Sequence, residues 1–260
     1  MLRCSLLILV GLLATAPPLA AKIRTTKQSA SSSWSPLTPL VIGSGFEFQT
    51  DSEQSQYDFP ILVQYNVTEA LRLTVEPNFV HIGAKTDGVD SVTGFGDLET
   101  SVEFEFLSER RLRPAVSAEA LIKWPTATDS DIGSPGRDTS FGLILSKDLE
   151  VVDLDSNLLY TFVGDPDEGN TFEISLAGEV HLGELFDLEA EVLTSVGTGS
   201  IRGRPGTIGG LGSGSSGTEG TLGLAWHANE HLKLEVGGVL SSDGSWQLVS
   251  AWEWSFSGED

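Results

Sequence analysis

The feature that most constrains this chain is a two-residue alternation of apolar and polar side chains, repeated in segments of roughly ten residues. In residues 98–106, every even-numbered position is apolar or threonine and every odd-numbered position is glutamate or serine. In residues 186–192, the even-numbered positions are again apolar and the odd-numbered positions are acidic. A β-strand sends alternate side chains to opposite faces, whereas a helix of 3.6 residues per turn mixes the two sets. The alternation therefore predicts strands with one apolar face and one polar face.

Similar patterns recur along nearly the whole chain. They predict strands at residues 41–49, 56–66, 71–82, 95–107, 112–124, 138–147, 151–163, 170–182, 185–197, 217–227, 231–240 and 244–256. Beyond the first two dozen residues, no segment approaches the roughly 18 continuous apolar residues of a membrane-spanning helix. A membrane protein with this pattern must cross the bilayer with strands. We therefore expect an all-β fold, a membrane-spanning up-and-down antiparallel β-barrel of about 12 strands.

The links between the predicted strands alternate in length. Tight links lie near Thr68, Glu109, Leu149, Gly183 and Asn229, and the longer polar links are 83–94, 125–137, 165–169 and 197–217. Outer-membrane barrels have this asymmetry, with short periplasmic turns and longer external loops. The short link at 241–243 is an exception. A soluble secreted β-sandwich is the alternative architecture, and such a protein would be recovered from the periplasm without detergent.

Aromatic side chains gather at the two ends of the predicted strands. With the N-terminus in the periplasm, the external set is Phe48, Tyr57, Phe59, Phe79, Trp124, Phe141, Tyr160, Phe162, Phe172 and Trp246. The periplasmic set is Tyr65, Phe104, Phe106, Phe186, Trp226, Trp252, Trp254 and Phe256. Transmembrane barrels carry such girdles where the wall meets the two membrane surfaces. The alternating aromatics of the last strand also resemble the C-terminal signal of bacterial outer-membrane proteins, although four more residues follow Phe256.

Short segments flank the predicted barrel. The organisation we expect is a signal peptide at 1–21, a flexible periplasmic lead-in at 22–40, the barrel at 41–256 and a C-terminal tail at 257–260. The first segment has a positive Arg3, an apolar core at 6–13 and small residues before the expected cleavage site, which is the pattern of a secretory signal. The single cysteine, Cys4, lies in this segment, so the mature chain would form no disulfide.

The charge balance is strongly acidic, with 15 Lys and Arg against 37 Asp and Glu and a formal net charge of −22. This charge disfavours nucleic acid as a partner, because phosphate backbones are bound through basic side chains. Export without disulfides fits the outer membrane of a Gram-negative bacterium. The partners we expect there are outer-membrane lipid, lipopolysaccharide, the barrel-assembly machinery and a small-molecule solute of unknown identity.

Two motifs add a resemblance to a known family. Gly94-Phe95-Gly96-Asp97-Leu98 opens one predicted strand, and Trp124-Pro125-Thr126 begins a loop that ends in Gly133-Ser134-Pro135-Gly136-Arg137-Asp138. With the repeated hairpin rhythm over most of the mature chain, these motifs resemble the meta-pathway phenol-degradation family, whose members look like transporter-type outer-membrane barrels. Ala127 stands where the family loop usually has glycine, so we expect a difference in loop conformation. The resemblance implies the barrel fold and, through the family's name, a link to aromatic compounds.

The polar face of the strands is predicted to line the barrel interior, and it is strongly acidic. The lining candidates are Glu99, Glu103, Glu105, Arg113, Glu119, Lys123, Asp155, Glu179, Glu189, Glu191, Lys233 and Glu235. The same face also includes Arg72 and the acids Glu47, Asp58, Glu76, Asp153, Glu173, Asp187 and Glu253. We expect Glu105 to pair with Arg113 across a hairpin turn. Because four bases cannot neutralise sixteen acids, the other carboxylates must be hydrated, protonated or bound to cations.

Motifs that suggest catalysis or cofactors lack the context they need. His227 and His231 are four residues apart, but a zinc protease needs a helix and a glutamate directly after the first histidine. The run 212–217 matches a dinucleotide-binding fingerprint without a following helix, and Arg202 and Arg204 in the same link are interpreted as solvated charges. His81 and His181 lack a nearby nucleophile motif. We therefore expect no enzyme activity, no cofactor and no metal site.

The sequence as a whole predicts an outer-membrane channel or uptake barrel for small solutes, with an acidic lumen that favours cations. The family resemblance suggests aromatic or other hydrophobic compounds as solutes. About twelve strands give a narrow lumen, which an inward loop could constrict. The alternative is a non-conducting envelope barrel that acts in adhesion, structure or a partner complex.

Overall fold

The computed structural model describes residues 39–50, 54–84, 91–166, 168–197 and 216–256. The predicted signal peptide, nearly all of the predicted lead-in and the C-terminal tail lie outside these residues, as do Arg202, Arg204 and most of the glycine-rich run 212–217. Within the described ranges, no helix is long and apolar enough to cross a membrane.

The described chain consists of β-strands and their connections. The strands are β1 (Leu40–Thr50), β2 (Gln54–Thr68), β3 (Leu71–Glu76), β4 (Asn78–Ala84), β5 (Val92–Phe95), β6 (Leu98–Leu107), β7 (Ala115–Trp124), β8 (Asp138–Asp148), β9 (Val152–Phe162), β10 (Thr171–His181), β11 (Phe186–Gly197), β12 (Gly217–His227), β13 (Leu232–Ser241) and β14 (Trp246–Phe256). They follow the predicted strands closely, because the period-2 pattern marks each strand over its full length.

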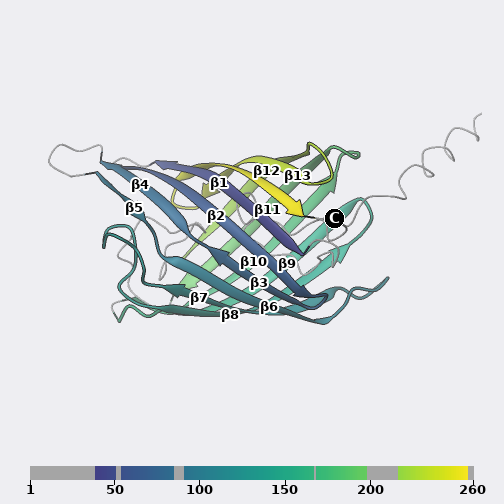
Figure 1. Cartoon of the computed structure of the whole chain (residues 1–260), viewed down its shortest axis with the longest axis horizontal. Helices are drawn as coiled ribbons and strands as arrows, with labels where there is room; N and C mark the ends of the chain where they lie inside the picture. Colours follow the sequence, from purple (N-terminus) through teal and green to yellow (C-terminus); the bar gives the residue numbers. More distant parts are fainter. Residues whose placement is uncertain (1–38, 51–53, 85–90, 167, 198–215, 257–260) are drawn as a thin grey trace, which may run out of the picture.

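The strands form one closed antiparallel sheet (Figure 1). Each of the strands β6 to β13 pairs with the next along the chain, and β1 pairs with both β2 and β14. Because β3 and β4 lie end to end along β2, and β5 and β6 continue one another on the other side, the fourteen segments make twelve barrel strands. The prediction of a twelve-stranded up-and-down barrel is confirmed. Closure pairs each of the described strands on both sides except β5, which pairs with β4.

Two strands predicted as continuous are interrupted in the structure. The predicted strand 71–82 breaks at Pro77, which lacks the N–H that a ladder needs, and the predicted strand 95–107 breaks at Gly96 and Asp97. The wall stays hydrogen-bonded across both breaks: the N–H of Ile61 donates to the Pro77 carbonyl at 2.9 Å, and Gly96 N–H donates to Asn78 at 2.9 Å. The sheet therefore stays paired across the two interruptions.

The strand predicted to begin at residue 112 begins instead at Ala115. Pro114 cannot donate to the ladder, and Arg110 and Arg113 exchange backbone hydrogen bonds of 2.9 and 3.0 Å that close a tight turn before it. Arg113 is therefore part of the turn. The prediction that Arg113 lies within a barrel strand is wrong.

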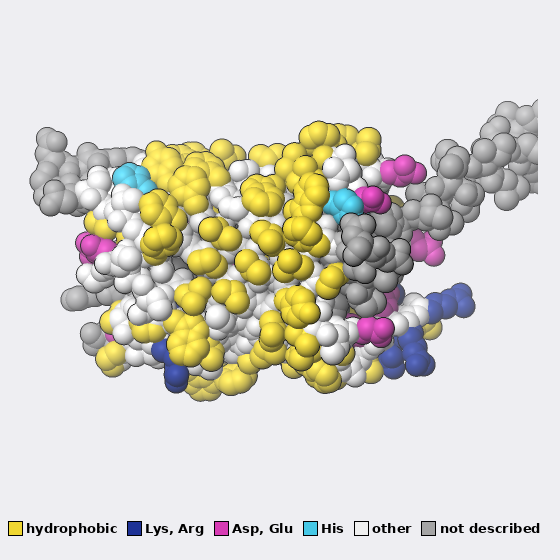
Figure 2. All heavy atoms as spheres, in the orientation of Figure 1, with side chains coloured by type: hydrophobic (Ala, Val, Ile, Leu, Met, Phe, Trp, Pro, Cys, Tyr) yellow, Lys and Arg dark blue, Asp and Glu magenta, His cyan; other side chains and the backbone are white. Residues whose placement is uncertain are grey.

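The two faces of the wall differ sharply in chemistry. Figure 2 shows hydrophobic side chains spread over the outside of the barrel, with the charged side chains in view toward its two ends. Large apolar residues stand half-exposed on this face along every part of the wall, for example Val102, Leu176, Leu188 and Leu222. A soluble protein does not expose so much contiguous apolar surface, whereas a membrane barrel presents it to lipid.

Aromatic rings form a contiguous chain at the predicted external end of one side of the barrel. Ring centroids 5.0 to 6.4 Å apart link, in order, Trp246, Phe48, Tyr57, Phe46, Phe59, Phe79 and Phe95. A second group of Phe141, Tyr160 and Phe162 lies on β8 and β9. At the opposite end, Trp254 stacks on His231 at 5.7 Å. This grouping agrees with the predicted girdles, and it gains stability from edge-to-face ring contacts.

Candidate functional site

The polar face of the strands points to the barrel interior and is buried. Nine of the twelve lining candidates are less than a tenth exposed: Glu103, Glu119, Lys123, Asp155, Glu179, Glu189, Glu191, Lys233 and Glu235. Glu99 and Glu105 are half-buried on the same face of β6, whereas Arg113 lies in the turn before β7. The alternation along each strand thus places nearly all the candidates on one continuous inner wall.

Lys233 of β13 is the centre of an ion cluster inside the barrel. Its Nζ lies 2.6 Å from Glu235, 2.9 Å from Glu189 and 3.9 Å from Glu179. The Lys233 side chain is 9% exposed and Glu179 is fully buried, so the three carboxylates gather around one ammonium away from solvent. One amine group thus lies among three carboxyl groups in this part of the wall.

Arg72 of β3 holds a second group of interior acids. Its Nη1 donates to Oε2 of Glu103 at 3.4 Å, and both side chains are 4% exposed. Glu119 and Glu105 lie near enough to act electrostatically on the same guanidinium. Glu105 thus interacts with Arg72, whereas Arg113 donates to the carbonyl of Ser108 at 2.8 Å. The expected pairing of Glu105 with Arg113 is wrong because Arg113 closes the turn.

A third interior group lies toward the predicted external end and contains an acid that the sequence reading missed. Glu47 of β1 faces Asp58 of β2 in register, and both Asp58 and Glu219 of β12 act on it electrostatically. Asp58 accepts hydrogen bonds from the amides of Gln56 at 2.7 Å and Asn78 at 3.2 Å. Glu219 is 2% exposed. Glu219 lies at an odd-numbered position of β12, whereas Leu222 and Leu224 lie at even-numbered positions. The alternation along the strand therefore indicates that Glu219 faces inward.

The family motif at Asp97 anchors the long loop 125–137. One carboxylate oxygen, Oδ1, accepts from the backbone N–H groups of Thr126 and Ala127, both at 3.0 Å. The other, Oδ2, accepts from the N–H of Ser134 at 2.8 Å and from its hydroxyl at 3.1 Å. Asp97 is 2% exposed, so these bonds replace water at a buried charge. The motif alone does not indicate this anchoring role of Asp97, because the bonded groups lie about 30 to 37 residues further along the chain.

The same loop packs against the inner side of the wall. Ile132 is buried, and its Cδ1 lies so close to Gly94 of β5 that a Cβ there would be only 3.2 Å away. A Cβ on Gly133 would overlap the methyl of Ala127. Glu150 is the one described non-glycine residue with a positive φ, so Ala127 keeps an ordinary backbone conformation. Gly133 therefore makes room for alanine at the position where the family usually has glycine.

At the base of this loop, Lys123 forms an ion pair with Asp138, with both side chains less than a tenth exposed. Asp138 also accepts from the N–H of Gly164 at 2.8 Å. The buried Asp138 carboxylate thus links the end of β7, where Lys123 lies, to the connection after β9, where Gly164 lies.

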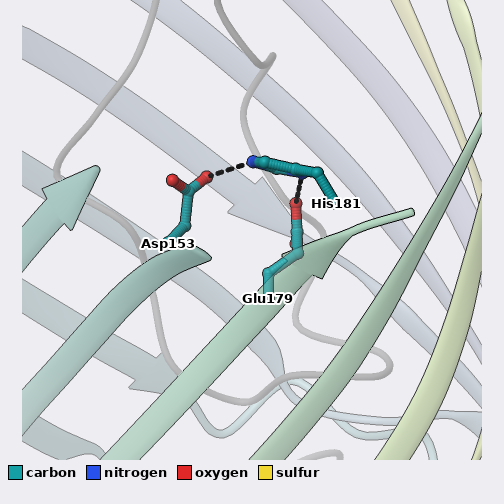
Figure 3. Close-up of side chains that lie close together, drawn as sticks. All are labelled: Asp153, Glu179 and His181. Atoms are coloured by element: carbon teal, nitrogen blue, oxygen red, sulfur yellow. Dashed lines mark ion pairs between the residues drawn. The ribbon is translucent and has the colours of Figure 1, made fainter. Parts of the chain in front are cut away.

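A cluster of histidines and acids lies at the opposite end. Asp187 of β11 accepts from Nδ1 of His181 at 2.8 Å and from Nε2 of His227 at 2.5 Å. Nε2 of His181 lies 3.6 Å from Asp153 of β9, and Nδ1 of His181 lies 4.0 Å from Glu179 (Figure 3). Asp187 joins His181 to His227. The sequence does not predict this cluster, because its residues lie on four different strands, β9 to β12.

Comparisons with known proteins agree with this architecture. The COG4313 outer membrane channel from Pseudomonas putida F1 aligns with a TM-score of 0.67 at 14% identity, over 90% of this chain and 100% of that chain. The NanC porin gives 0.60 at 11% identity, over 84% and 100%. The KdgM porin gives 0.55 at 11% identity, over 83% and 99%. At these identities the likeness concerns the fold, which is that of outer-membrane β-barrels.

No curated protein sequence matches the chain significantly. A family model described as "Putative MetA-pathway of phenol degradation" matches residues 30–243, which is most of the chain and includes both motifs around Asp97 and Pro125. The suspected resemblance is confirmed, and the chain belongs to this MetA-pathway phenol-degradation family of β-barrels.

Proposed function

We propose that this protein is an outer-membrane channel for small solutes, with an acidic interior that favours cations over anions. The observation that carries the proposal is the chemistry of the wall. Its outer face is apolar, and its inner face holds many more carboxylates than bases. Carboxylates in a narrow, low-dielectric passage create a negative potential that gathers cations and repels anions.

The family description supports aromatic compounds as the first solute class to test. The acidic interior then predicts which aromatic compounds pass most readily. A neutral or cationic ring such as benzyl alcohol or benzylamine should pass faster than benzoate, because the carboxylate of benzoate is repelled by interior acids. Uptake of the three compounds into proteoliposomes, corrected for leakage through protein-free vesicles, measures this order. Benzoate entering fastest would contradict it.

Conductance tests the channel itself. The purified barrel in a planar bilayer should conduct, and a salt gradient should give a cation-selective reversal potential at low salt. Selectivity should fall at high salt, because the Debye length shortens from about 30 Å at 0.01 M to about 3 Å at 1 M. The combined variant Glu47→Gln, Asp58→Asn and Glu219→Gln should move the reversal potential toward zero. These substitutions keep the side-chain shape and remove the charge.

A matched variant removes the same number of charges outside the interior. Glu69, Glu184 and Glu230 are exposed on the short turns, and their replacement by glutamine should change the reversal potential much less. An anion-selective channel, or equal effects of the two variants, would show that the group of Glu47, Asp58 and Glu219 does not border the conducting path.

A non-conducting envelope barrel is the second candidate. It is supported by the burial of the interior charges and by the packing of Ile132 against the inner wall at Gly94. A barrel that inserts and folds but gives no conductance, with loop 125–137 either intact or shortened, would favour this candidate over a channel.

A further inference from the structure

Three side chains from neighbouring strands converge at the predicted periplasmic end of the barrel interior. Asp153 begins β9, and Glu179 and His181 end β10 (Figure 3). One ligand atom from each residue lies within 4.8 Å of the other two. The register of the sheet explains the convergence, because Glu179 is the direct partner of Asp153 and His181 lies two residues further on the same face of β10.

The imidazole of His181 is held in a defined orientation. Its Nδ1–H donates to Asp187 at 2.8 Å, and Asp187 is held in turn by Nε2–H of His227 at 2.5 Å. The other ring nitrogen, Nε2, faces Asp153 at 3.6 Å, whereas Glu179 lies 4.0 Å from Nδ1. A carboxylate that fixes one imidazole N–H and leaves the second nitrogen toward another acidic side chain is the usual arrangement behind a metal-binding histidine.

The site is both accessible and rich in negative charge. The Asp153 and His181 side chains are each 20% exposed, whereas Glu179 is fully buried beneath them. An ion can therefore reach the cluster from the end of the barrel, and its positive charge would offset carboxylates that lie close together. Lys233 lies 3.9 Å from Glu179, on the side facing Glu189 and Glu235.

We propose that Asp153, Glu179 and His181 bind a divalent first-row transition metal, with Asp187 as the positioning residue for His181. One nitrogen and two carboxylate oxygens suit zinc, cobalt, iron or manganese, whereas calcium and magnesium prefer an all-oxygen shell. Zinc bonds to these ligands are about 2.0–2.2 Å long, so small side-chain rotations bring the three groups to a common ion. Water would complete the coordination. The site does not depend on whether the barrel conducts.

Metal binding to the purified, folded barrel tests the proposal. The protein in detergent, prepared without a polyhistidine tag and stripped with EDTA, should bind one Zn²⁺ per barrel in calorimetry. Co²⁺ should give visible absorption bands from the same site. His181→Gln and Asp153→Asn should each weaken Zn²⁺ binding by at least about tenfold, and Asp187→Asn should weaken it by about 10- to 100-fold through the orientation of His181.

The matched control is His231→Gln, which removes a histidine from a nearby turn, where it stacks on Trp254. This variant should bind Zn²⁺ as the unmodified barrel does. Gel migration before and after boiling shows that every variant is folded, so a lost site is distinguished from a lost barrel. Absence of stoichiometric Zn²⁺ binding, or binding that His181→Gln leaves unchanged, would overturn the proposal. Equal affinity for Ca²⁺ would also overturn it, because such a site would be selecting charge alone.

Discussion

The outer and inner surfaces of the same wall follow opposite rules of burial. On β11, Leu188 is 40% exposed and Val192 is 55% exposed, whereas the intervening Glu189 and Glu191 are 1% and 3% exposed. In a soluble protein this order is reversed, because apolar side chains leave water. Here the outer face meets hydrocarbon, so the apolar side chains are matched to their surroundings. The burial on β11 shows that its acidic side chains lie on the inner face of the wall, away from hydrocarbon.

The buried acids have different partners toward the two ends of the barrel interior. Toward the predicted periplasmic end, Lys233 and Arg72 each sit among several carboxylates. Toward the external end, Glu47 and Asp58 lie side by side, and Asp58 is held by neutral amides. Buried charge is expensive without compensation, so the first region should determine stability and the second should determine the field that a solute meets.

The largest effect on stability should come from removing the interior base. Lys233→Met leaves Glu179, Glu189 and Glu235 together without their ammonium, and breaking a buried pair costs about 3–5 kcal/mol. Lys147→Met is the matched control, because Lys147 pairs with Glu109 at a partly exposed rim, where a pair contributes about 0–1 kcal/mol. Urea unfolding in lipid vesicles, followed by tryptophan fluorescence, measures both. Equal losses of unfolding free energy in the two variants would mean that the interior is as hydrated as the rim.

A slightly smaller effect should distinguish the two faces on a single strand. Leu222 is 61% exposed at the middle of β12, and its neighbour Thr221 points inward beside Glu191. Leu222→Arg should destabilise the barrel by roughly 2–4 kcal/mol, the cost of arginine near the bilayer midplane. Thr221→Arg should cost less because Glu191 offers a partner. The heat-modifiable fraction after folding into vesicles gives the comparison, and a greater loss for Thr221→Arg would reverse the assignment of faces.

The smallest effect on stability should be local, in loop 125–137 between β7 and β8. Asp97→Asn keeps the shape but replaces one acceptor oxygen by a donor that faces the Ser134 or Thr126 N–H, which should cost about 1–3 kcal/mol. The barrel should still fold, while loop 125–137 becomes more sensitive to proteinase K. Asp129→Asn is the control, because the exposed Asp129 carboxylate accepts a turn bond from the N–H of Asp131. If both variants are cleaved at the unmodified rate, Asp97 does not anchor the loop.

Most of the fold can be predicted from the sequence, because the face on which a side chain lies depends on the alternation within its own strand. Leu188 and Glu189, for example, are assigned to opposite faces from the sequence alone. The exceptions are also local. Pro77 and Pro114 interrupt or delay strands because each lacks a backbone donor, a signal present in the sequence but overridden by the strong alternation around it.

Periodicity and composition are enough to predict the class of fold, the number of strands, the apolar belt and the many acidic residues of the inner face. Which interior groups meet depends on the three-dimensional fold. Lys233 joins Glu179 across two intervening strands, Asp97 reaches Ser134 across 37 residues, and His181 shares Asp187 with His227. These partnerships depend on the register of the ladder and the curvature of the closed sheet. A two-residue period specifies the face of a side chain but leaves its neighbours along that face undetermined.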